Sequence, residues 1–488
     1  MAKIDEKRRE KILNGNMWGV IISICSPLFL YYLFTSIYSF VDMIFANEIS
    51  TGSVSSVAAL SQIKNLLSSL GGAISAGGAI LVARQFGAGD FIKAKKYANV
   101  MFSLITISVT ALALICIPLA YPICKWSGIS SAQANAATGY FIVQIIDLLF
   151  VAYNGMFIAL QKSKGNTKSI FLLNVISMIV KLIFNYLFIY VLHVTNIIWI
   201  AIATLLSQVF LFSILSFEGF KKDNIFRITL KEFSLAKDYV KRILQISIPI
   251  FIGKFVFSFG KVIVNSIFGA QYLEILKSQI DINDPEALLQ AETAAGLVVG
   301  ALAVSGNMNG MITSPCIAFE EAESTIISQN LGNKNMKRAI ECFFKTFVIS
   351  CGFGAIGYIL VRFTFQDELI SIFNTASTPE QAQQFMAYVK EIHVYDSLTI
   401  PALAINCAVL GVLYGFGRTK TTMVMNIARL FVFRIPTLLI LLYFFPELGV
   451  SCAGISMGIS NIGIAVMGIV CLIVFSIKLK KESYKQPI

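Results

Sequence analysis

Long apolar segments dominate this sequence and restrict what it can fold into. Of its 488 residues, 56% are hydrophobic and only 14% are charged, whereas a soluble chain carries about 25% charged residues. Each segment is long enough to cross about 30 Å of hydrocarbon as a helix. The sequence therefore predicts an all-α polytopic membrane protein with twelve transmembrane helices, at 17–46, 56–85, 97–120, 138–160, 170–192, 196–217, 243–270, 294–330, 343–365, 386–414, 423–445 and 452–476.

The positive charges between these segments predict the orientation. With the N-terminus placed in the cytoplasm, the tails and inner loops hold 29 of the 39 Lys and Arg, and the outer loops hold only Lys125 and Lys277. Loops rich in Lys and Arg stay on the cytoplasmic side. We therefore expect a multi-pass protein of the cell (inner) membrane with both termini in the cytoplasm. The net charge of +12 is explained by these loops, so the lipid bilayer is the expected partner and nucleic acid is not.

The sequence contains an internal repeat. ILVARQFGAGDFIKA (80–94) aligns with TIISQNLGNKNMKRA (325–339) without a gap, and the Gly-x-Thr-Lys tetrad at 165–168 pairs with that at 417–420. Pro27 in the first segment likewise pairs with Pro249 in the seventh. Two homologous halves are therefore expected: a six-helix lobe at 1–217, a cytoplasmic linker at 218–242 and a second six-helix lobe at 243–488. Such repeats place a cavity between the halves.

Several of these stretches resemble the multidrug and toxic compound extrusion (MATE) family. Tyr38-Ser-Phe-Val-Asp42 resembles part of its first helix, GGAILVARQFGAGD its second helix and inner loop, and residues 165–190 its fifth helix. The resemblance implies two pseudo-symmetric lobes in a V-shaped arrangement around a central cavity. It also implies export of substrates by proton or sodium antiport. We expect the protein to be a monomer. Related flippases of lipid-linked glycans share the wider fold, so the fold does not settle the substrate.

Polar residues at helical spacing mark candidate surfaces of the cavity. One stripe contains Tyr38 and Asp42. Asp42 is the best candidate for proton coupling, because an isolated carboxylate in a medium of low dielectric can load and release a proton near neutral pH. The resemblance also implies a coupling aspartate at this position. The other stripes are Asn174, Ser177, Lys181 and Asn185; Lys254, Ser258, Lys261 and Asn265; and Asn309, Thr313, Glu320 and Glu323. Buried hydrogen bonding between helices is the alternative for their uncharged members.

Lys181 departs from the family pattern. Family members with a proton site in this lobe carry Asn, three intervening residues and Asp on the fifth helix, where this chain has Lys181 and Asn185. A lysine beside Asp42 would keep the carboxylate ionised, and proton binding at Asp42 would release Lys181. We therefore assign proton coupling to Asp42 and Lys181. Sodium-coupled relatives carry a glutamate on the seventh helix, but residues 243–270 contain no acid, which makes sodium the weaker alternative.

The second half carries basic residues at membrane depth. Lys254 and Lys261 lie in the seventh segment, and Arg429 and Arg434 lie in the eleventh. A charge in hydrocarbon costs about 2.5–3.5 kcal/mol at mid-helix, so each should face a cavity or a partner. Either they form a self-neutralising network with Glu320, Glu323 and Asp396, or they form a basic wall that attracts an anionic or zwitterionic substrate. Asp147 in the fourth segment has no partner that the sequence identifies.

The sequence leaves three functions open. The first is a secondary active exporter of amphiphilic or drug-like compounds, driven by protons. The second is a flippase or exporter of a lipid-linked or anionic precursor, since Lys and Arg suit a phosphate head group. The third, a membrane-embedded enzyme, is remote because no nucleophile with a positioned base is evident. The nine cysteines are scattered singly, so we expect neither a metal site nor a disulfide framework, and no cofactor.

Overall fold

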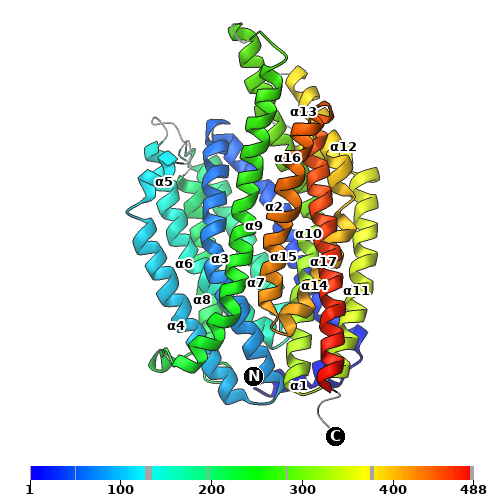
Figure 1. Ribbon diagram of the computed structural model, residues 1–488. Coiled ribbons are helices and arrows are strands. Elements are labelled where there is room, and N and C mark those ends of the chain that lie inside the picture. The colour runs from blue at the N-terminus through cyan, green and yellow to red at the C-terminus, as the bar shows by residue number, and fades with distance from the viewer. Residues whose placement is uncertain are drawn as a thin grey trace. The chain divides into compact units, whose positions relative to one another are not determined.

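The computed structural model describes residues 2–49, 51–126, 134–194, 196, 198–281, 284–373 and 379–483. These residues are almost entirely helical (Figure 1). Eleven of the described helices are long and apolar enough to cross a membrane, and one further pair, Pro379–Ser397 and Ile400–Gly415, passes the same test together with a bend of 47°. The predicted all-α membrane fold is therefore confirmed, and the tenth predicted segment corresponds to the bent pair.

The chain divides into two compact units, which are described separately. Unit 1 comprises Met1–Ile252, Glu321–Phe343 and Val412–Lys420, and unit 2 comprises Gly253–Glu320, Phe344–Gly411 and Thr421–Ile488. The helices before the linker are α1 (Ala2–Asn14), α2 (Met17–Ile49), α3 (Thr51–Gly87), α4 (Phe91–Cys116), α5 (Ala120–Trp126), α6 (Ala134–Ser163), α7 (Thr167–Tyr186), the π-helical η1 (Leu187–Val191) and α8 (Ile198–Phe220).

The remaining helices follow the linker, which itself contains the short 3-10 helix η2 (Leu230–Glu232). They are α9 (Lys237–Lys277), α10 (Pro285–Gly332), α11 (Met336–Ile359), η3 (Leu360–Thr364), α12 (Gln366–Phe373), α13 (Pro379–Ser397), α14 (Ile400–Gly415), α15 (Thr419–Ala428), η4 (Arg429–Arg434), α16 (Ile435–Phe444), η5 (Pro446–Leu448) and α17 (Ser451–Ser483). Of these, η3 and η4 are π-helical.

Within unit 1, the two copies of the repeat meet at the turns that follow α3 and α10. A Cβ atom on Gly87 would lie 2.1 Å from the carbonyl oxygen of Gln329, and one on Gly332 would lie 1.9 Å from that of Arg84. Only glycine allows the backbones to approach so closely. The two copies of the repeat are therefore packed against each other as well as similar in sequence.

The N-terminal helix α1 is bound to several of these segments in unit 1. Arg9 donates from Nε to the carbonyl oxygen of Phe86 (2.7 Å) and from Nη2 to that of Gly87 (2.7 Å). These carbonyls end α3 and have no partner inside the helix. Arg338 of α11 donates from Nε to the carbonyl oxygen of Ile12 (3.2 Å). Helix α1 thus joins the ends of α3 and α11.

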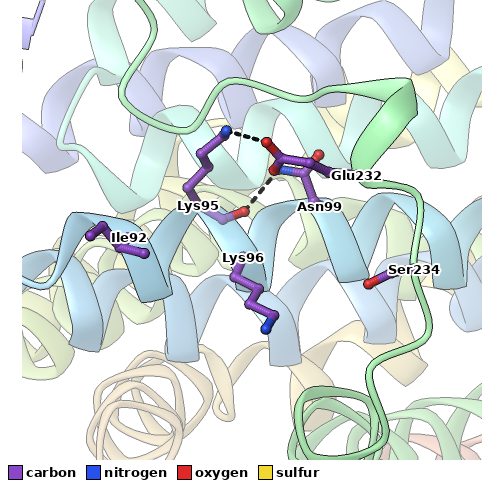
Figure 2. A pocket seen from close by; sticks show the side chains of 6 residues that line it. All are labelled: Ile92, Lys95, Lys96, Asn99, Glu232 and Ser234. Carbon is purple, nitrogen blue, oxygen red and sulfur yellow. Dashed lines mark hydrogen bonds and ion pairs between the residues drawn. The ribbon is translucent and has the colours of Figure 1, made fainter.

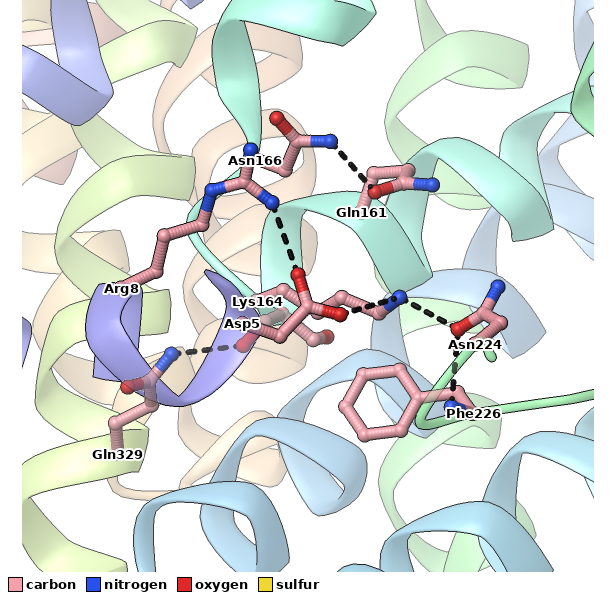
Figure 3. A network of polar contacts seen from close by, with 9 residues as sticks. Asp5, Arg8, Gln161, Lys164, Asn166, Asn224, Phe226 and Gln329 are labelled. Atoms are coloured by element: carbon pink, nitrogen blue, oxygen red, sulfur yellow. Dashed lines mark hydrogen bonds and ion pairs between the residues drawn. The ribbon is translucent and has the colours of Figure 1, made fainter. Parts of the chain in front are cut away.

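A buried ion pair also attaches α1 to the rest of unit 1 (Figure 3). Lys164, in the turn between α6 and α7, lies with Nζ 3.3 Å from Oδ2 of Asp5 and 2.6 Å from Oδ1 of Asn224, which belongs to the linker. The side chains of Asp5 and Lys164 are 0% and 1% exposed. Burial lowers the pKa of Lys164 from its ordinary value, while Asp5 acts against this shift. Its ammonium also lies 5.1 Å from the ring centre of Phe226, a favourable cation–π contact.

Candidate functional site

Three basic side chains of unit 2 converge on one aromatic ring. The guanidinium carbon of Arg429 lies 4.3 Å from the ring centre of Phe257, that of Arg434 lies 6.0 Å away, and Nζ of Lys261 lies 4.9 Å away. These distances are within the range of cation–π attraction. We call Lys261, Arg429 and Arg434 the basic cluster.

Local helix geometry explains this convergence. Phe257 and Lys261 are one turn apart on α9, which places them on the same face. Arg429 and Arg434 are five residues apart, and in a regular α-helix they would point in clearly different directions. They begin and end the π-helical segment η4, where each turn takes up more residues. This segment brings both guanidinium groups to one side, and π-helical turns occur frequently at functional sites.

Neutral side chains hold the two arginines in place. Nε of Arg434 donates to Oγ of Ser460 (2.9 Å), and its Nη2 donates to Oδ1 of Asn461 (3.1 Å). Arg429 donates from Nε to the same oxygen of Asn461 (3.0 Å). The amide of Asn461 is itself oriented by Thr399, to whose Oγ1 it donates from Nδ2 (3.0 Å). These contacts fix the arginines without neutralising their charge.

Asp396 is the acid of the site. It lies on α13, is 1% exposed and accepts a hydrogen bond from Oγ of Ser305 (3.2 Å). The same hydroxyl lies 3.4 Å from Nδ1 of His393. Arg434, Arg429 and Lys261 all interact electrostatically with Asp396. The carboxylate therefore balances one positive charge of the basic cluster.

Unit 1 contains a separate buried ion pair. Nζ of Lys64 on α3 lies 2.5 Å from Oδ2 of Asp147 on α6, and the side chain of Asp147 is 0% exposed. Its second oxygen, Oδ1, is also buried and makes no hydrogen bond to the part of the chain that the structure describes. The sequence offers no partner for Asp147, because 83 residues separate it from Lys64. The pair is therefore visible only in the fold.

A cavity of 350 Å³ lies between α4 and the linker of unit 1, lined by Ile92, Lys95, Lys96, Asn99, Glu232 and Ser234 (Figure 2). Nζ of Lys95 is paired with Glu232 at 2.5 Å. Asn99 fastens the linker, because its Nδ2 donates to the carbonyl oxygen of Arg227 (3.1 Å) and its Oδ1 accepts from the amide of Thr229 (2.9 Å). These contacts attach the linker to α4.

Comparison with known proteins settles the family. The family model MatE matches residues 27–187 and 295–440, which is more than half of the chain. The chain belongs to the MatE family. Comparison with curated proteins gives no match.

Solved MATE structures share the fold of the chain over nearly its whole length. A MATE protein in complex with MaL6 has a TM-score of 0.85 at 17% identity, covering 96% of this chain and 99% of that one. A MOP superfamily transporter from Pyrococcus furiosus has a TM-score of 0.84 at 17% identity, covering 98% of each chain. A MATE family multidrug resistance transporter in an outward-facing conformation has a TM-score of 0.83 at 17% identity, covering 96% and 98%.

Membership of the MatE family and this fold make the chain a polytopic membrane transporter of the efflux type. The predicted site residues of this MatE protein fall in both units. Lys261, Arg429, Arg434 and Asp396 come together in unit 2. Lys254 is exposed on α9, and Glu320 is half-buried on α10. Glu323 is buried and belongs to the part of α10 that lies in unit 1.

The predicted coupling residues of this MatE protein belong to α2 and α7. The side chains of Tyr38 and Asp42 lie outside the described residues. Lys181 is half-buried on α7, where Asn174 and Asn185 are buried. Neither amide atom of Asn185 has a hydrogen-bond partner among the described residues. Their roles stay predictions.

Proposed function

We propose that this transporter is a secondary active exporter of amphiphilic small molecules, driven by a proton gradient through alternating access. The observation that supports proton coupling most is the buried pair of Lys64 and Asp147. A buried carboxylate and its cation depend on each other, because removing one partner leaves an uncompensated charge in a medium of low dielectric. Ionisable residues of this kind mark proton pathways in membrane transporters.

The contact between Asp147 and Lys64 has two states, which differ in the protonation of Asp147. When the carboxylate is ionised, it holds Lys64 and thereby ties α3 to α6. When a proton binds, the negative charge is lost and Lys64 must find another partner or release its own proton. The unpartnered Oδ1 leaves one side of the carboxylate available to a proton. Asp42 and Lys181, assigned to coupling from the sequence, would perform the same exchange between α2 and α7.

We place the protein in the cell (inner) membrane as a monomer, with both termini in the cytoplasm, because Lys and Arg concentrate in the loops that share a side with the N-terminus. Sodium is the alternative coupling ion.

An exporter is favoured over a membrane-embedded enzyme, because the family is a transporter family.

Transport by reconstituted protein tests the proposal. Asp147→Asn should abolish accumulation driven by a pH gradient, while substrate counterflow, which needs no gradient, continues at a comparable rate. Asp367→Asn is the matched control, because Asp367 forms an exposed ion pair with Lys390 (2.9 Å). Retained counterflow shows that the variant is folded. Proton-driven accumulation by Asp147→Asn at the wild-type rate would exclude Asp147 as the coupling group, and the same comparison applies to Asp42→Asn.

A flippase or exporter of a lipid-linked anionic precursor is the second candidate. The basic cluster favours it, because guanidinium groups recognise phosphate through charge-assisted hydrogen bonds. For the Pyrococcus furiosus transporter, reverse polarity of the binding pocket suggests a different function. Translocation of a fluorescent polyprenyl phosphate between bilayer leaflets, measured by dithionite quenching, distinguishes this function from the export of soluble amphiphiles.

A further inference from the structure

We propose that the basic cluster of unit 2 binds the anionic head group of an amphiphilic substrate. The inference rests on the proposed transport function and names the substrate class. It assigns specificity to Lys261 and Arg429, with Arg434 as the residue that positions Arg429. It also decides between the two accounts of these charges that the sequence leaves open.

The charge balance of the site is the first argument. Lys261 interacts electrostatically with Arg429, Arg434 and Asp396. Among the described residues, three cations therefore face one acid. Like charges gathered around one ring repel each other where the dielectric is low. Asn461 and Ser460 accept hydrogen bonds from the arginines but carry no charge. A self-neutralising network of three cations would need a second and a third acid. The charges of the basic cluster and Asp396 therefore favour the binding of an anion.

The three cations differ in solvent exposure, and this difference indicates different roles. Lys261 is exposed on α9, Arg429 is half-buried, and Arg434 is buried. The buried guanidinium is held by Ser460 and Asn461, which leaves it little freedom to follow a ligand. Lys261 and Arg429 can therefore contact an anion directly. Arg434 shares Asn461 with Arg429 and fixes the direction of its guanidinium.

The cluster lies on apolar segments, which fits the apolar part of an amphiphile. Lys261 belongs to the candidate membrane span Lys237–Lys277, and Arg429 and Arg434 belong to the span Thr419–Phe444. The ring of Phe257 lies next to all three cations. Basic groups beside an aromatic surface match a ligand in which a charged head adjoins a hydrocarbon chain.

Binding to the purified full-length protein tests the proposal. The probes are dodecyl phosphate, dodecyltrimethylammonium and inorganic phosphate, measured by equilibrium dialysis in a neutral detergent. The wild type should bind dodecyl phosphate more tightly than dodecyltrimethylammonium. Lys261→Gln should weaken dodecyl phosphate binding by about tenfold, as expected for the loss of one charge-assisted contact, and Lys261→Arg should restore it. Lys277→Gln is the matched control at the far end of α9, where Lys277 is paired with Glu274 (3.2 Å).

A second variant keeps the test valid if the substitution of Lys261 perturbs folding. Asn461→Asp has nearly the same shape and adds the negative charge that the cluster lacks. It should raise the thermal stability of the empty protein and weaken dodecyl phosphate binding by about tenfold or more. A structural network would show the gain in stability with unchanged binding, and this result would overturn the proposal.

The probes also distinguish the possible sources of the anion. Inorganic phosphate alone should compete only at concentrations far above those of dodecyl phosphate, because it lacks the hydrocarbon chain. Equal competition would show a site for free anions and would contradict the amphiphile. Equal affinity for the two dodecyl compounds would contradict the anionic head group. Binding is measured without a gradient, so these outcomes are independent of the proton-driven transport that tests the proposed function.

Discussion

Arg84 and Gln329 occupy equivalent positions in the two repeats, and each donates a hydrogen bond to the opposite half of the sequence. Nη2 of Arg84 donates to the carbonyl oxygen of Gly415 (2.9 Å), and Nε2 of Gln329 donates to that of Ser163 (2.7 Å). Ser163 and Gly415 also correspond, since each precedes a Gly-x-Thr-Lys tetrad by two residues. The internal symmetry of the sequence is thus expressed as a reciprocal exchange of contacts within unit 1.

The alternating access that we propose requires contacts of this kind to form in one state and break in another. Arg84→Gln and Gln329→Ala, each of which removes a donor to an acceptor in the opposite half, should therefore shift the equilibrium away from the described state. Distance measurements between spin labels on the two repeats should show a larger population of the separated state. Asn99→Ala, which loosens the linker from α4, should leave that population unchanged. Unaltered distance distributions in both exchange variants would contradict a gating role for these contacts.

The two glycines at the repeat turns give a prediction about stability. Gly87→Ala and Gly332→Ala place a methyl group about 2 Å from a backbone oxygen, so the segments must separate. Overpacking of this kind costs about 1–3 kcal/mol, and thermal unfolding in detergent should occur at a lower temperature. Gly310→Ala on the same helix as Gly332 is the control, because a Cβ there meets nothing within 4 Å. An equal melting temperature for Gly332→Ala and Gly310→Ala would show that the close approach does not stabilise the fold.

The attachment of α1 by Arg9 can be measured by hydrogen exchange. Arg9→Gln removes the donors to the last carbonyls of α3, which have no other partner within that helix. Amide exchange across residues 2–14 and around 84–88 should accelerate by about tenfold. Lys7→Gln is the matched control, because Lys7 is exposed on the same helix. Equal exchange in the two variants would show that α1 is held by other contacts.

The buried Lys164 makes stability depend on pH in the alkaline range. Its pKa is lowered in the folded protein from the ordinary 10.5, mainly by burial. Between the lowered pKa and 10.5 the unfolded chain binds more protons than the folded one, so the free energy of unfolding contributed by this group increases as pH rises through this window. Thermal unfolding of the wild type and Lys164→Met should be compared from pH 8 to 10.5. The wild-type melting temperature should rise relative to that of the variant, and a constant difference would contradict the assignment.

Much of the fold could be predicted from the sequence, because apolar length and loop charge are local properties. The repeat at 80–94 and 325–339 correctly identified two equivalent turns, since their glycines are required by close backbone contact. For Asp396, Arg429 and Arg434 the sequence left two accounts open, a self-neutralising network and a basic wall for an anionic substrate, because it does not encode which helices face each other.

Two features of the sites depend on geometry that the sequence does not encode locally. The convergence of Arg429 and Arg434 requires the π-helical segment η4, which regular helical spacing does not predict. The pair of Lys64 and Asp147 requires the packing of α3 against α6. Lys254 and Lys261 show the same limit, because both are exposed on α9, two turns apart, yet of the two it is Lys261 that lies over the Phe257 ring.

The central claim is that a proton gradient powers export, and one transport experiment tests it most directly. Proteoliposomes containing the wild-type protein are given a pH gradient or a sodium gradient of equal size, and uptake of radiolabelled dodecyl phosphate is recorded. The account predicts accumulation with the pH gradient alone, abolished by a protonophore and absent in Asp147→Asn. Accumulation driven by the sodium gradient and insensitive to the protonophore would contradict it.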